Sequence, residues 1–600
     1  MKSEFRVAGQ TAYDRRGPIR WIVSHFLHNR RFVVAVACGV VVHISLNTLI
    51  PGLVGQAFDA ILETPPDRHT LGVIALVLLA ITLLRGVVDL GQALSWEVLA
   101  KRMERDTRDE LYVSLLGKSQ TFHNRQRVGD LMARAANDVR QLNMMVNPGL
   151  ALITESLFGL VIPIVFIGFL DWRLLLSPLL FAVAFAFALR RYMRQLNPVS
   201  GEMRKRFGML NAGLTEAVTG IEVVKSTAQE GQERDKFSKS ARSYRDAAVQ
   251  QGVVQARYLP TLIMAVTSAA ALCHGLYLVS KDELSPGGLV TYLGLIALLR
   301  FPTFISIFTF SLVQLGVVSA ERILALIKEE TELDENQAGH VAPIEGEIVF
   351  DNVTFGYGGE PVLKNVSFRA APGETIAIVG ETGSGKSTLT KLVPRIYDVD
   401  DGRILIDGVD VREWHLTSLR SQISTIEQDI VLFSRPVAEN IAFSLGQRVE
   451  MEAIERAARD AQADGFIRAL PEGYETTIGE RGVTLSGGQR QRIAIARALL
   501  TDPRILIIDD STSAIDSETE DQIQRAIRRV LEGRTTLLIT HRLSQIRWAD
   551  RVIVLRRGEV VDQGTHDELL VRCELYRRIF ARYDWTPDEV EAGAVAVGVA

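Results

Sequence analysis

The sequence predicts a multi-domain protein in which an all-α transmembrane domain of six long helices precedes an α/β domain. Three observations lead to this fold class. The chain has 600 residues, which is too long for one domain. Hydrophobic residues make up 47% of it although 23% are charged, and the mean hydropathy is +0.13. This mixture is typical of a membrane part joined to a water-soluble part. Finally, the second half contains an apolar strand, a glycine-rich loop and a helix in direct succession.

Charge and cysteine content argue against several classes of protein. The formal net charge is −4, so the chain offers no strongly basic surface for nucleic acid. Cys38, Cys273 and Cys573 are far apart and form neither a disulfide framework nor a metal-ligand spacing. We interpret them as small buried hydrophobic residues. No apolar run occurs before residue 32, which argues against a cleavable signal peptide.

The first half begins with a polar segment, residues 1–17, which we expect to be mobile. Residues 18–31 mix apolar and basic side chains around Trp21 and predict an amphipathic helix on a membrane surface. Six apolar stretches follow, and a helix needs about 20 such residues to cross the hydrocarbon core. The predicted spans are residues 32–53, 71–94, 148–170, 174–189, 259–279 and 288–313.

Two connections between the spans are too long for simple loops. Residues 95–147 and 190–258 are charged and rich in helix formers, so each predicts two helices that leave the membrane and meet at a turn. Basic residues gather near the span ends on this side, whereas the other side offers few, such as Arg68 and Lys281. This asymmetry places the two arms and both termini in the cytoplasm. The predicted boundaries are 1–31 for the N-terminal segment and surface helix, 32–328 for the transmembrane domain, 329–344 for an acidic linker, 345–583 for the α/β domain and 584–600 for a disordered tail.

Ionisable residues inside the spans are energetically costly and usually face protein or water. Arg85 and Asp89 are four residues apart, so they share a helix face and can pair. Glu155, His274 and Arg300 stand alone. Structural pairing between helices is the simpler interpretation, and the polar lining of a translocation path is the alternative.

The most specific motif is a glycine-rich loop that follows the apolar run 375–379 and precedes a helix starting near Thr388. Its residues are Gly380, Glu381, Thr382, Gly383, Ser384, Gly385, Lys386 and Ser387. Glycines let backbone N–H groups approach an anion closely, and the helix start adds free donors. Lys386 can reach the β- and γ-phosphates of a nucleotide, and the Ser387 hydroxyl can ligate Mg²⁺. The loop therefore predicts binding of a nucleoside triphosphate.

Two further apolar runs predict strands that end beside this loop. Residues 505–508 lead into Asp509, and residues 535–539 lead into Thr540 and His541. The carboxyl ends of parallel strands meet at one edge of a sheet, where ligands of α/β folds bind. A carboxylate at that edge is suited to holding Mg²⁺. Upstream of the loop, the ring of Tyr357 is a candidate to stack on a purine.

A second glycine-containing motif opens the helical run 490–500. It consists of Leu485, Ser486, Gly487, Gly488 and Gln489. Its glycines and the following helix start make a second anion site. Two phosphate-binding helix ends in one domain make sense if two such domains pair head to tail, because each can then close the nucleotide of the other.

With these motifs the chain resembles the half-transporters of the ATP-binding cassette exporter superfamily, over about residues 20–583. The resemblance implies ATP and Mg²⁺ as cofactors. It matches Tyr357 to the adenine-stacking aromatic, residues 380–388 to the phosphate site, and Asp509 to the Mg²⁺ carboxylate. By the same resemblance, Gln428 senses Mg²⁺ and the membrane arms, and His541 is the switch histidine at the γ-phosphate.

The resemblance also assigns segments that connect the parts. Residues 485–489 match the family signature, whose Ser486, Gly487, Gly488 and Gln489 complete the nucleotide site of the paired domain. Residues 513–516 match the loop that communicates between the two sites, and residues 479–482 the segment that contacts the arms. Residues 122–138 and 220–237 resemble the coupling regions of the two arms.

One position departs from the family pattern. The residue after Asp509 that polarises the attacking water is usually Glu, whereas this chain has Asp510. The carboxylate is one methylene shorter, about 1.5 Å less in reach, and a misplacement of about 1 Å can cost 100-fold in rate. Chains with this change are typically one half of a heterodimer, which we therefore favour; a homodimer in which Asp510 acts as catalyst stays open. The implied catalytic set is Asp510, His541, Lys386 and Gln428.

The expected function is ATP-driven transport across a membrane. ATP closes two nucleotide-binding domains against each other and turns the membrane cavity outward, and hydrolysis resets it. The substrate stays open among drugs, lipids and peptides. A lipid flippase or an importer on the same fold is an alternative, and a soluble cassette ATPase acting on nucleic acid is a second one, against which the six spans argue.

Overall fold

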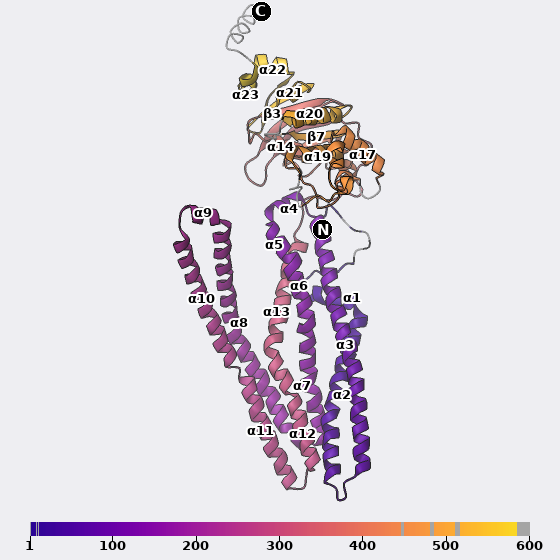
Figure 1. Ribbon diagram of the computed structural model, residues 1–600, viewed down its shortest axis with the longest axis vertical. Helices are drawn as coiled ribbons and strands as arrows, with labels where there is room; N and C mark the ends of the chain where they lie inside the picture. The colour runs from indigo at the N-terminus through magenta and orange to yellow at the C-terminus, as the bar shows by residue number, and fades with distance from the viewer. Residues whose placement is uncertain are drawn as a thin grey trace, which may run out of the picture. The chain divides into compact units, whose positions relative to one another are not determined.

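The computed structural model divides the chain into two compact units. One unit contains residues 10–112 and 129–328, and we call it the helical unit. The other contains residues 1–9, 113–128 and 329–600, and we call it the nucleotide unit. Figure 1 shows the elements of both. The described part omits residues 1, 6, 8, 10, 446–448, 480–484, 511–516 and 585–600, and the side chains of 306–308, 310, 510, 517–522 and 581–584.

Helices make up the regular structure of the helical unit. Six helical stretches of the described chain are long and apolar enough to cross a membrane, which confirms the predicted number of spans. Its α-helices are α1 (Pro18–His28), α2 (Arg30–Leu62), α3 (Arg68–Leu116), α5 (Val128–Ala133), α6 (Val139–Met144), α7 (Ala151–Leu170), α8 (Leu176–Thr219), α9 (Ile221–Ser226), α10 (Glu230–Ala256), α11 (Leu259–Ser280), α12 (Pro286–Leu298) and α13 (Arg300–Lys328). Shorter turns are η1 (Arg134–Asp138), η2 (Met145–Leu150) and η3 (Trp172–Leu175).

Two details of the helices differ from the sequence prediction. Each arm carries a short helix where a turn was expected: α9 lies between α8 and α10, and α4 (Gln120–Arg125) follows α3. Six-residue helices are too short to show a periodic pattern. The last span is divided into α12 and α13 at Leu299. Pro302 explains the break, since its ring lacks an N–H and crowds the carbonyl of Leu298.

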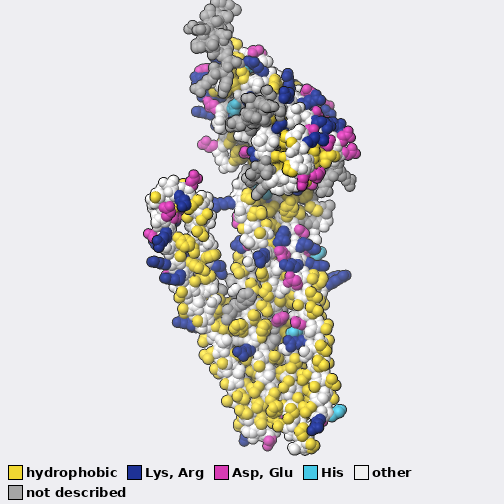
Figure 2. Space-filling model, in the orientation of Figure 1, with side chains coloured by type: hydrophobic (Ala, Val, Ile, Leu, Met, Phe, Trp, Pro, Cys, Tyr) yellow, Lys and Arg dark blue, Asp and Glu magenta, His cyan; other side chains and the backbone are white. Residues whose placement is uncertain are grey.

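Apolar side chains cover much of the lower part of the helical unit in Figure 2, and basic side chains gather along its arms. Inside, small residues let the helices approach closely. A side chain on Gly55 of α2 would lie 2.2 Å from the carbonyl oxygen of Gly287 in α12. Asp59 holds the same crossing, because its Oδ1 accepts from the N–H of Gly287 at 2.6 Å and its Oδ2 from the Ser285 hydroxyl at 2.7 Å. Small residues at such contacts are typical of membrane helices.

The nucleotide unit contains two sheets. One is a four-stranded antiparallel sheet in the order β2-β1-β4-β5, and the other has six strands in the order β10-β9-β3-β8-β7-β6, parallel except for β10. The strands are β1 (Ile348–Phe355), β2 (Leu363–Ala370), β3 (Thr375–Gly380), β4 (Asp401–Ile406), β5 (Val409–Asp410), β6 (Ile423–Ile426), β7 (Ile505–Asp510), β8 (Thr535–Thr540), β9 (Arg551–Arg556) and β10 (Glu559–Gly564). This arrangement confirms the predicted α/β class.

Helices and short helical turns connect and cover these strands. The helices are α14 (Lys386–Leu392), α15 (Leu416–Arg420), α16 (Val437–Ile441), α17 (Met451–Asp460), α18 (Asp464–Arg468), α19 (Gly487–Thr501), α20 (Ser517–Leu531), α21 (Leu543–Ile546), α22 (His566–Arg572) and α23 (Glu574–Asp584). The turns are η4 (Ala442–Ser444) and η5 (Gly473–Glu475).

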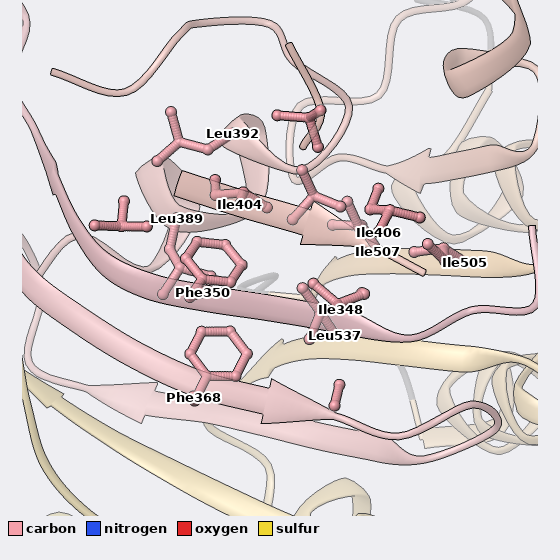
Figure 3. Close-up of a cluster of buried hydrophobic side chains, with 14 of the residues drawn as sticks. Ile348, Phe350, Phe368, Leu389, Leu392, Ile404, Ile406, Ile505, Ile507 and Leu537 are labelled. Atoms are coloured by element: carbon pink, nitrogen blue, oxygen red, sulfur yellow. The ribbon is translucent and has the colours of Figure 1, made fainter. Parts of the chain in front are cut away.

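The core of the nucleotide unit lies on both faces of the parallel sheet. Ile505 and Ile507 of β7 belong to a cluster with residues of β1, β2, β4 and α14, in which the rings of Phe350 and Phe368 stack 4.5 Å apart (Figure 3). The alternate residues Leu506 and Ile508 face a second cluster with α19 and α20. Burial on both faces explains why the strand reads as one continuous apolar run.

Candidate functional site

Parallel register brings the predicted site residues to one edge of the six-stranded sheet. Ile378 of β3 lies opposite Ile539 of β8, and Ile539 lies opposite Asp509 of β7. Ile426 at the end of β6 lies opposite Ile508. The strands therefore end together, and the residues that follow them meet at the same edge. These residues are the loop from Gly380, Gln428, Asp509, Asp510 and His541.

The loop after β3 depends on glycine at its first position. A Cβ on Gly380 would lie 2.1 Å from the carbonyl oxygen of Leu555, so a side chain there would displace β9. Gly383 has a φ of +80°, in the left-handed region that glycine adopts without strain. Inside the loop, Ser384 is 3% exposed and its hydroxyl has no hydrogen-bond partner among the described residues. An unsatisfied buried hydroxyl fits a loop that is built to receive a ligand.

Lys386 places a buried cation inside the loop. The side chain is 9% exposed, and its ammonium donates to the carbonyls of Gly380 at 2.9 Å and Glu381 at 3.0 Å. Burial lowers the pKa of Lys386, and the negative charge of Asp509 opposes that shift. The carbonyl bonds hold the ammonium in the cradle of the loop, where its charge can act on an anion.

Ser387 and Asp509 form the pair that a divalent cation requires. The Ser387 hydroxyl donates to Asp509 Oδ2 at 2.6 Å. A hydroxyl and a carboxylate are hard oxygen ligands, and Mg²⁺ binds through one or two such groups together with substrate phosphates. These two residues therefore fit Mg²⁺.

Tyr357 lies over the first turn of α14. Its hydroxyl shares a hydrogen bond of 3.2 Å with the Thr388 hydroxyl, and its side chain is 52% exposed. The ring makes a T-shaped contact with the ring of Tyr397, with ring centroids 5.3 Å apart. An exposed aromatic fixed beside the phosphate loop is placed to stack on a base.

His541 follows β8 directly and lies in the electric field of the loop. Loss of surrounding water lowers the pKa of His541, the charge of Lys386 lowers it further, and Asp509 opposes both. The imidazole is therefore neutral at neutral pH. A neutral ring can accept a hydrogen bond on one nitrogen and donate on the other.

Several predicted residues are placed only in part. Gln428 is exposed two residues beyond β6. The backbone of Asp510 ends β7 opposite Thr540, but its side chain lies outside the described residues. Residues 480–482 and 513–516 also lie outside them, so the expectations for these segments stay predictions.

The signature residues begin α19 and form a reciprocal cap. The Ser486 hydroxyl accepts from the N–H of Gln489 at 3.2 Å, and Gln489 Oε1 accepts from the N–H of Ser486 at 2.9 Å. Gly487 and Gly488 form the first turn of α19. Within the described chain, no hydrogen bond or ion pair joins these four residues to the loop at Lys386. The helix start at Ser486 and the loop at Lys386 are therefore not bonded to each other within the described chain.

The short helix α4 belongs to the nucleotide unit and contacts the α/β part of that unit through residues whose partners the sequence did not indicate. Asn124 Nδ2 donates to the Tyr397 hydroxyl at 2.8 Å, and Phe122 is 3% exposed. Just before α4, the N–H of Ser119 donates to the Thr331 hydroxyl at 2.8 Å. The predicted coupling region 122–138 begins within this helix. Burial of the Tyr397 ring raises its pKa, so the phenol stays protonated.

In the helical unit, ionisable residues line a pocket of about 350 Å³. His43, Arg85 and Glu155 contribute to it from α2, α3 and α7, together with apolar residues such as Phe301. The spacing of Arg85 and Asp89 permits an ion pair, but none is found between them in the described chain. Asp89 Oδ1 instead lies 3.7 Å from His43 Nδ1. Glu155 Oε1 accepts from Gln92 Nε2 at 3.1 Å.

Six spanning helices and a sheet edge with a phosphate loop define a membrane protein that binds nucleotide. Comparisons with known proteins agree. The family model "ABC transporter transmembrane region" matches residues 33–303, and "ABC transporter" matches residues 363–513. The chain belongs to the ABC transporters; it has the architecture of an exporter half-transporter that hydrolyses ATP.

Individual relatives extend over nearly the whole chain. An "ATP-dependent lipid A-core flippase" of Syntrophus aciditrophicus is 35% identical and covers 92% of each chain. A "putative multidrug export ATP-binding/permease protein" of Bacillus subtilis is 34% identical over 92% of this chain and 97% of its own. The solved structure of a bacterial Atm1-family ABC exporter with ATP bound superposes with a TM-score of 0.79 at 30% identity, covering 93% of this chain and 99% of that one.

Proposed function

We propose that ATP and Mg²⁺ bind between the phosphate loop of one nucleotide-binding domain and the signature motif of a second. The observation that carries this proposal is the separation, within one chain, of the loop at Lys386 from the capped helix start at Ser486. In a head-to-tail pair of domains, the phosphate loop of each domain faces the signature motif of the other, which creates two nucleotide sites. Half-transporters act as dimers, which supports such a pair.

Each residue at the sheet edge then has a role. The bound Mg²⁺ would supply positive charge to the phosphate oxygens, and Ser387 and Asp509 would hold it with Gln428 nearby. Lys386 neutralises charge on the β- and γ-phosphates. Neutral His541 orients the water or the γ-phosphate through a hydrogen bond, and Asp510 accepts the proton of the attacking water. The exposed ring of Tyr357 stacks on the base.

The short helix α4 carries this chemistry to the membrane part in the proposed mechanism. The bond from Asn124 of α4 to Tyr397 and the bond from the preceding Ser119 to Thr331 support a coupling role, because Tyr397 contacts the ring of Tyr357. The excess of Lys and Arg near the arms supports placing the nucleotide-binding domain in the cytoplasm. Asp510 in place of Glu supports a heterodimer, in which the signature of this chain completes the faster site of its partner.

An amphipathic molecule is the substrate class that the helical unit favours. The pocket at Arg85 combines charged groups with apolar walls, and the names of relatives, lipid A-core flippase and putative multidrug export protein, support this class. Arg85, His43 and Glu155 are proposed to line the translocation path. The alternative of an importer on the same plan has no specific observation in its favour.

The test is ATPase activity of the assembled transporter in liposomes, measured against a panel of lipids, peptides and hydrophobic drugs with and without Mg²⁺. We expect activity to require Mg²⁺ and to be stimulated by one class of amphipath. Arg85→Ala should change that stimulation and leave the KM for ATP unaltered. Activity that persists in chelator, or that no member of the panel alters, would contradict the proposal.

A further inference from the structure

Residues 2–5 lie in the nucleotide unit and bridge two distant parts of it. The N–H of Glu4 donates to the carbonyl of Gly117 at 2.9 Å, and the carbonyl of Ser3 accepts from the N–H of Glu335 at 2.9 Å. Lys2 Nζ adds a bond of 3.2 Å to the carbonyl of Glu332. We call residues 2–5 the strap, because they join the end of α3 to the segment before β1. The sequence predicted a mobile segment here, since a short polar stretch shows no pattern of partners.

The turn between α3 and α4 is shaped to receive the strap. A Cβ on Gly117 would lie 2.1 Å from the Ser3 hydroxyl oxygen and 2.9 Å from the carbonyl oxygen of Phe5. Only glycine permits this approach. The Ser3 hydroxyl donates to the carbonyl of Phe5 at 2.7 Å and also lies 3.3 Å from the carbonyl of Gly117. The strap is therefore fitted against the backbone of this turn.

Glu4 anchors the strap to the nucleotide-binding domain through Arg420. Arg420 Nη1 donates to Glu4 Oε2 at 2.7 Å, and the two side chains are 30% and 12% exposed. The same guanidinium donates through Nε to the carbonyl of Pro394 at 3.0 Å and through Nη2 to that of Arg395 at 2.7 Å. These carbonyls follow α14, the helix that begins with Lys386. Charge-assisted bonds in a partly buried setting are stronger than exposed ion pairs.

The strap and α4 thus contact the same body through different residues. Asn124 reaches Tyr397 from α4 itself, whereas the strap holds the turn that precedes α4, at Gly117. Two attachments on either side of Ser119 fix the direction of α4 as well as its position. Without the strap, the turn before α4 would lose its bond at Gly117 and would keep the bond from Ser119 to Thr331.

We propose that the strap is a positioning element for energy coupling, and that Glu4 and Arg420 act through it on α4. Movement of the segment after α14 on nucleotide binding passes through Arg420 to the strap and so to the turn at Gly117. Glu4 does not touch the nucleotide in this scheme. The inference rests on the proposed coupling role of α4 and adds a second attachment to it.

Hydrogen–deuterium exchange of the full-length transporter tests the strap, compared without nucleotide and with Mg²⁺, ATP and vanadate. Glu4→Ala removes the acceptor of Arg420, and Glu4→Gln keeps a weaker one. Glu330→Ala is the matched control, since Glu330 is exposed on the adjacent segment and has no side-chain partner in the described chain. We expect Glu4→Ala to raise exchange at residues 113–119 roughly tenfold, the loss expected for a charge-assisted hydrogen bond.

The coupling role of the strap is tested by the change in hydrogen–deuterium exchange at α4 when nucleotide binds. Glu4→Ala should abolish the ATP-dependent change in exchange at residues 120–125, Glu4→Gln should reduce it, and the KM for ATP should shift by less than about twofold. If Glu4→Ala behaves like Glu330→Ala, or raises exchange but keeps the ATP response, the strap does not couple. If Glu4→Ala does not fold, Glu4→Gln decides by the same criteria. A wild-type α4 with no ATP response would instead refute the coupling role of α4 itself.

Discussion

Asn124 of α4 donates a hydrogen bond of 2.8 Å to the hydroxyl of Tyr397, which is 7% exposed. The rings of Tyr397 and Tyr357 make a T-shaped contact, and the Tyr357 hydroxyl shares a hydrogen bond of 3.2 Å with Thr388. The side chains of Asn124 and Tyr397 therefore connect the backbone of α4 to the ring of Tyr357, which is proposed to stack on the base. This contact gives α4 a route by which to sense an occupied site.

Tyr397→Phe removes the oxygen that Asn124 binds and keeps the ring against Tyr357. We expect the basal ATPase to retain its KM within about twofold, because the ring that supports Tyr357 is unchanged. Stimulation by the transported amphipath should fall several-fold, since α4 loses a bond of about 1 kcal/mol. Basal and stimulated activities in liposomes check this. Tyr576→Phe is the control, as its hydroxyl bonds only to His566 at 2.7 Å among the described residues; an equal loss in both variants would argue for a general effect on stability.

Lys386→Ala should abolish ATP-driven transport by any assembly that contains this chain. Lys386 is the buried cation of the loop, and removal of one preorganised charge-stabilising donor costs about 100-fold or more in turnover. Binding of a fluorescent ATP analogue and transport into vesicles check the two effects. Lys391→Ala provides the control, because Lys391 is an exposed lysine of the same helix. Transport by Lys386→Ala within about twofold of wild type would contradict the role.

The lowered pKa of His541 predicts that ATPase activity decreases on the acid side, or acid limb, of its pH profile. Its pKa is lowered from 6.5, so protonation occurs only in more acidic solution than for a free histidine. If the neutral ring is the working form, kcat should fall as the pH drops through that lowered pKa, and His541→Gln should lack this limb. Stability changes with the same sign: below pH 6.5 the unfolded chain binds a proton that the folded chain does not, so the free energy of unfolding decreases until the folded pKa is reached. A profile that keeps its acid limb in His541→Gln would assign the limb to another group.

Asp510 predicts slow turnover by the chain alone. Purified by itself, the chain should bind ATP and hydrolyse it far below the 1–100 s⁻¹ or so typical of phosphoryl-transfer enzymes. In the heterodimer, substitution of Ser486 should damage activity more than Asp510→Asn does, because Ser486 completes the faster site of the partner. Single-turnover ATPase measurements on the chain and on the complex distinguish these effects. Brisk activity of the lone chain that Asp510→Asn abolishes would establish a catalytic homodimer instead.

Most of the fold could be predicted from the sequence, because its signals are long or strong. Six apolar spans exceed the length that a soluble protein buries, and the run 505–508 of β7 is apolar on both faces. The phosphate loop depends on glycines that no other residue replaces, such as Gly380 beside Leu555. Local sequence therefore specifies these features completely.

The contacts that attach α4 could not be predicted in this way. Asn124 and Tyr397 belong to no motif that indicates their partners. Their hydrogen bond depends on the folded chain bringing the two residues together. Glu4 and Arg420 are 416 residues apart, and a single charge does not indicate its partner. The break at Leu299 had a local signal in Pro302, but its effect on a span depends on how neighbouring helices satisfy the freed carbonyl.

The three separate segments of the nucleotide unit have a consequence for biosynthesis. At about 5–20 residues per second, roughly 20 to 80 seconds pass between the translation of Glu4 and that of its partner Arg420. All six spans are translated in that interval, so insertion into the bilayer precedes closure of the nucleotide unit. Residues 2–5 and 113–128 can form their bonds to Arg420 and Tyr397 only after about two thirds of the chain has been translated. Ribosome stalling or chaperone failure late in translation would therefore leave a protein that is inserted in the membrane but whose nucleotide unit is incomplete. Quality-control proteases can reach this state from the side of the membrane where the arms end.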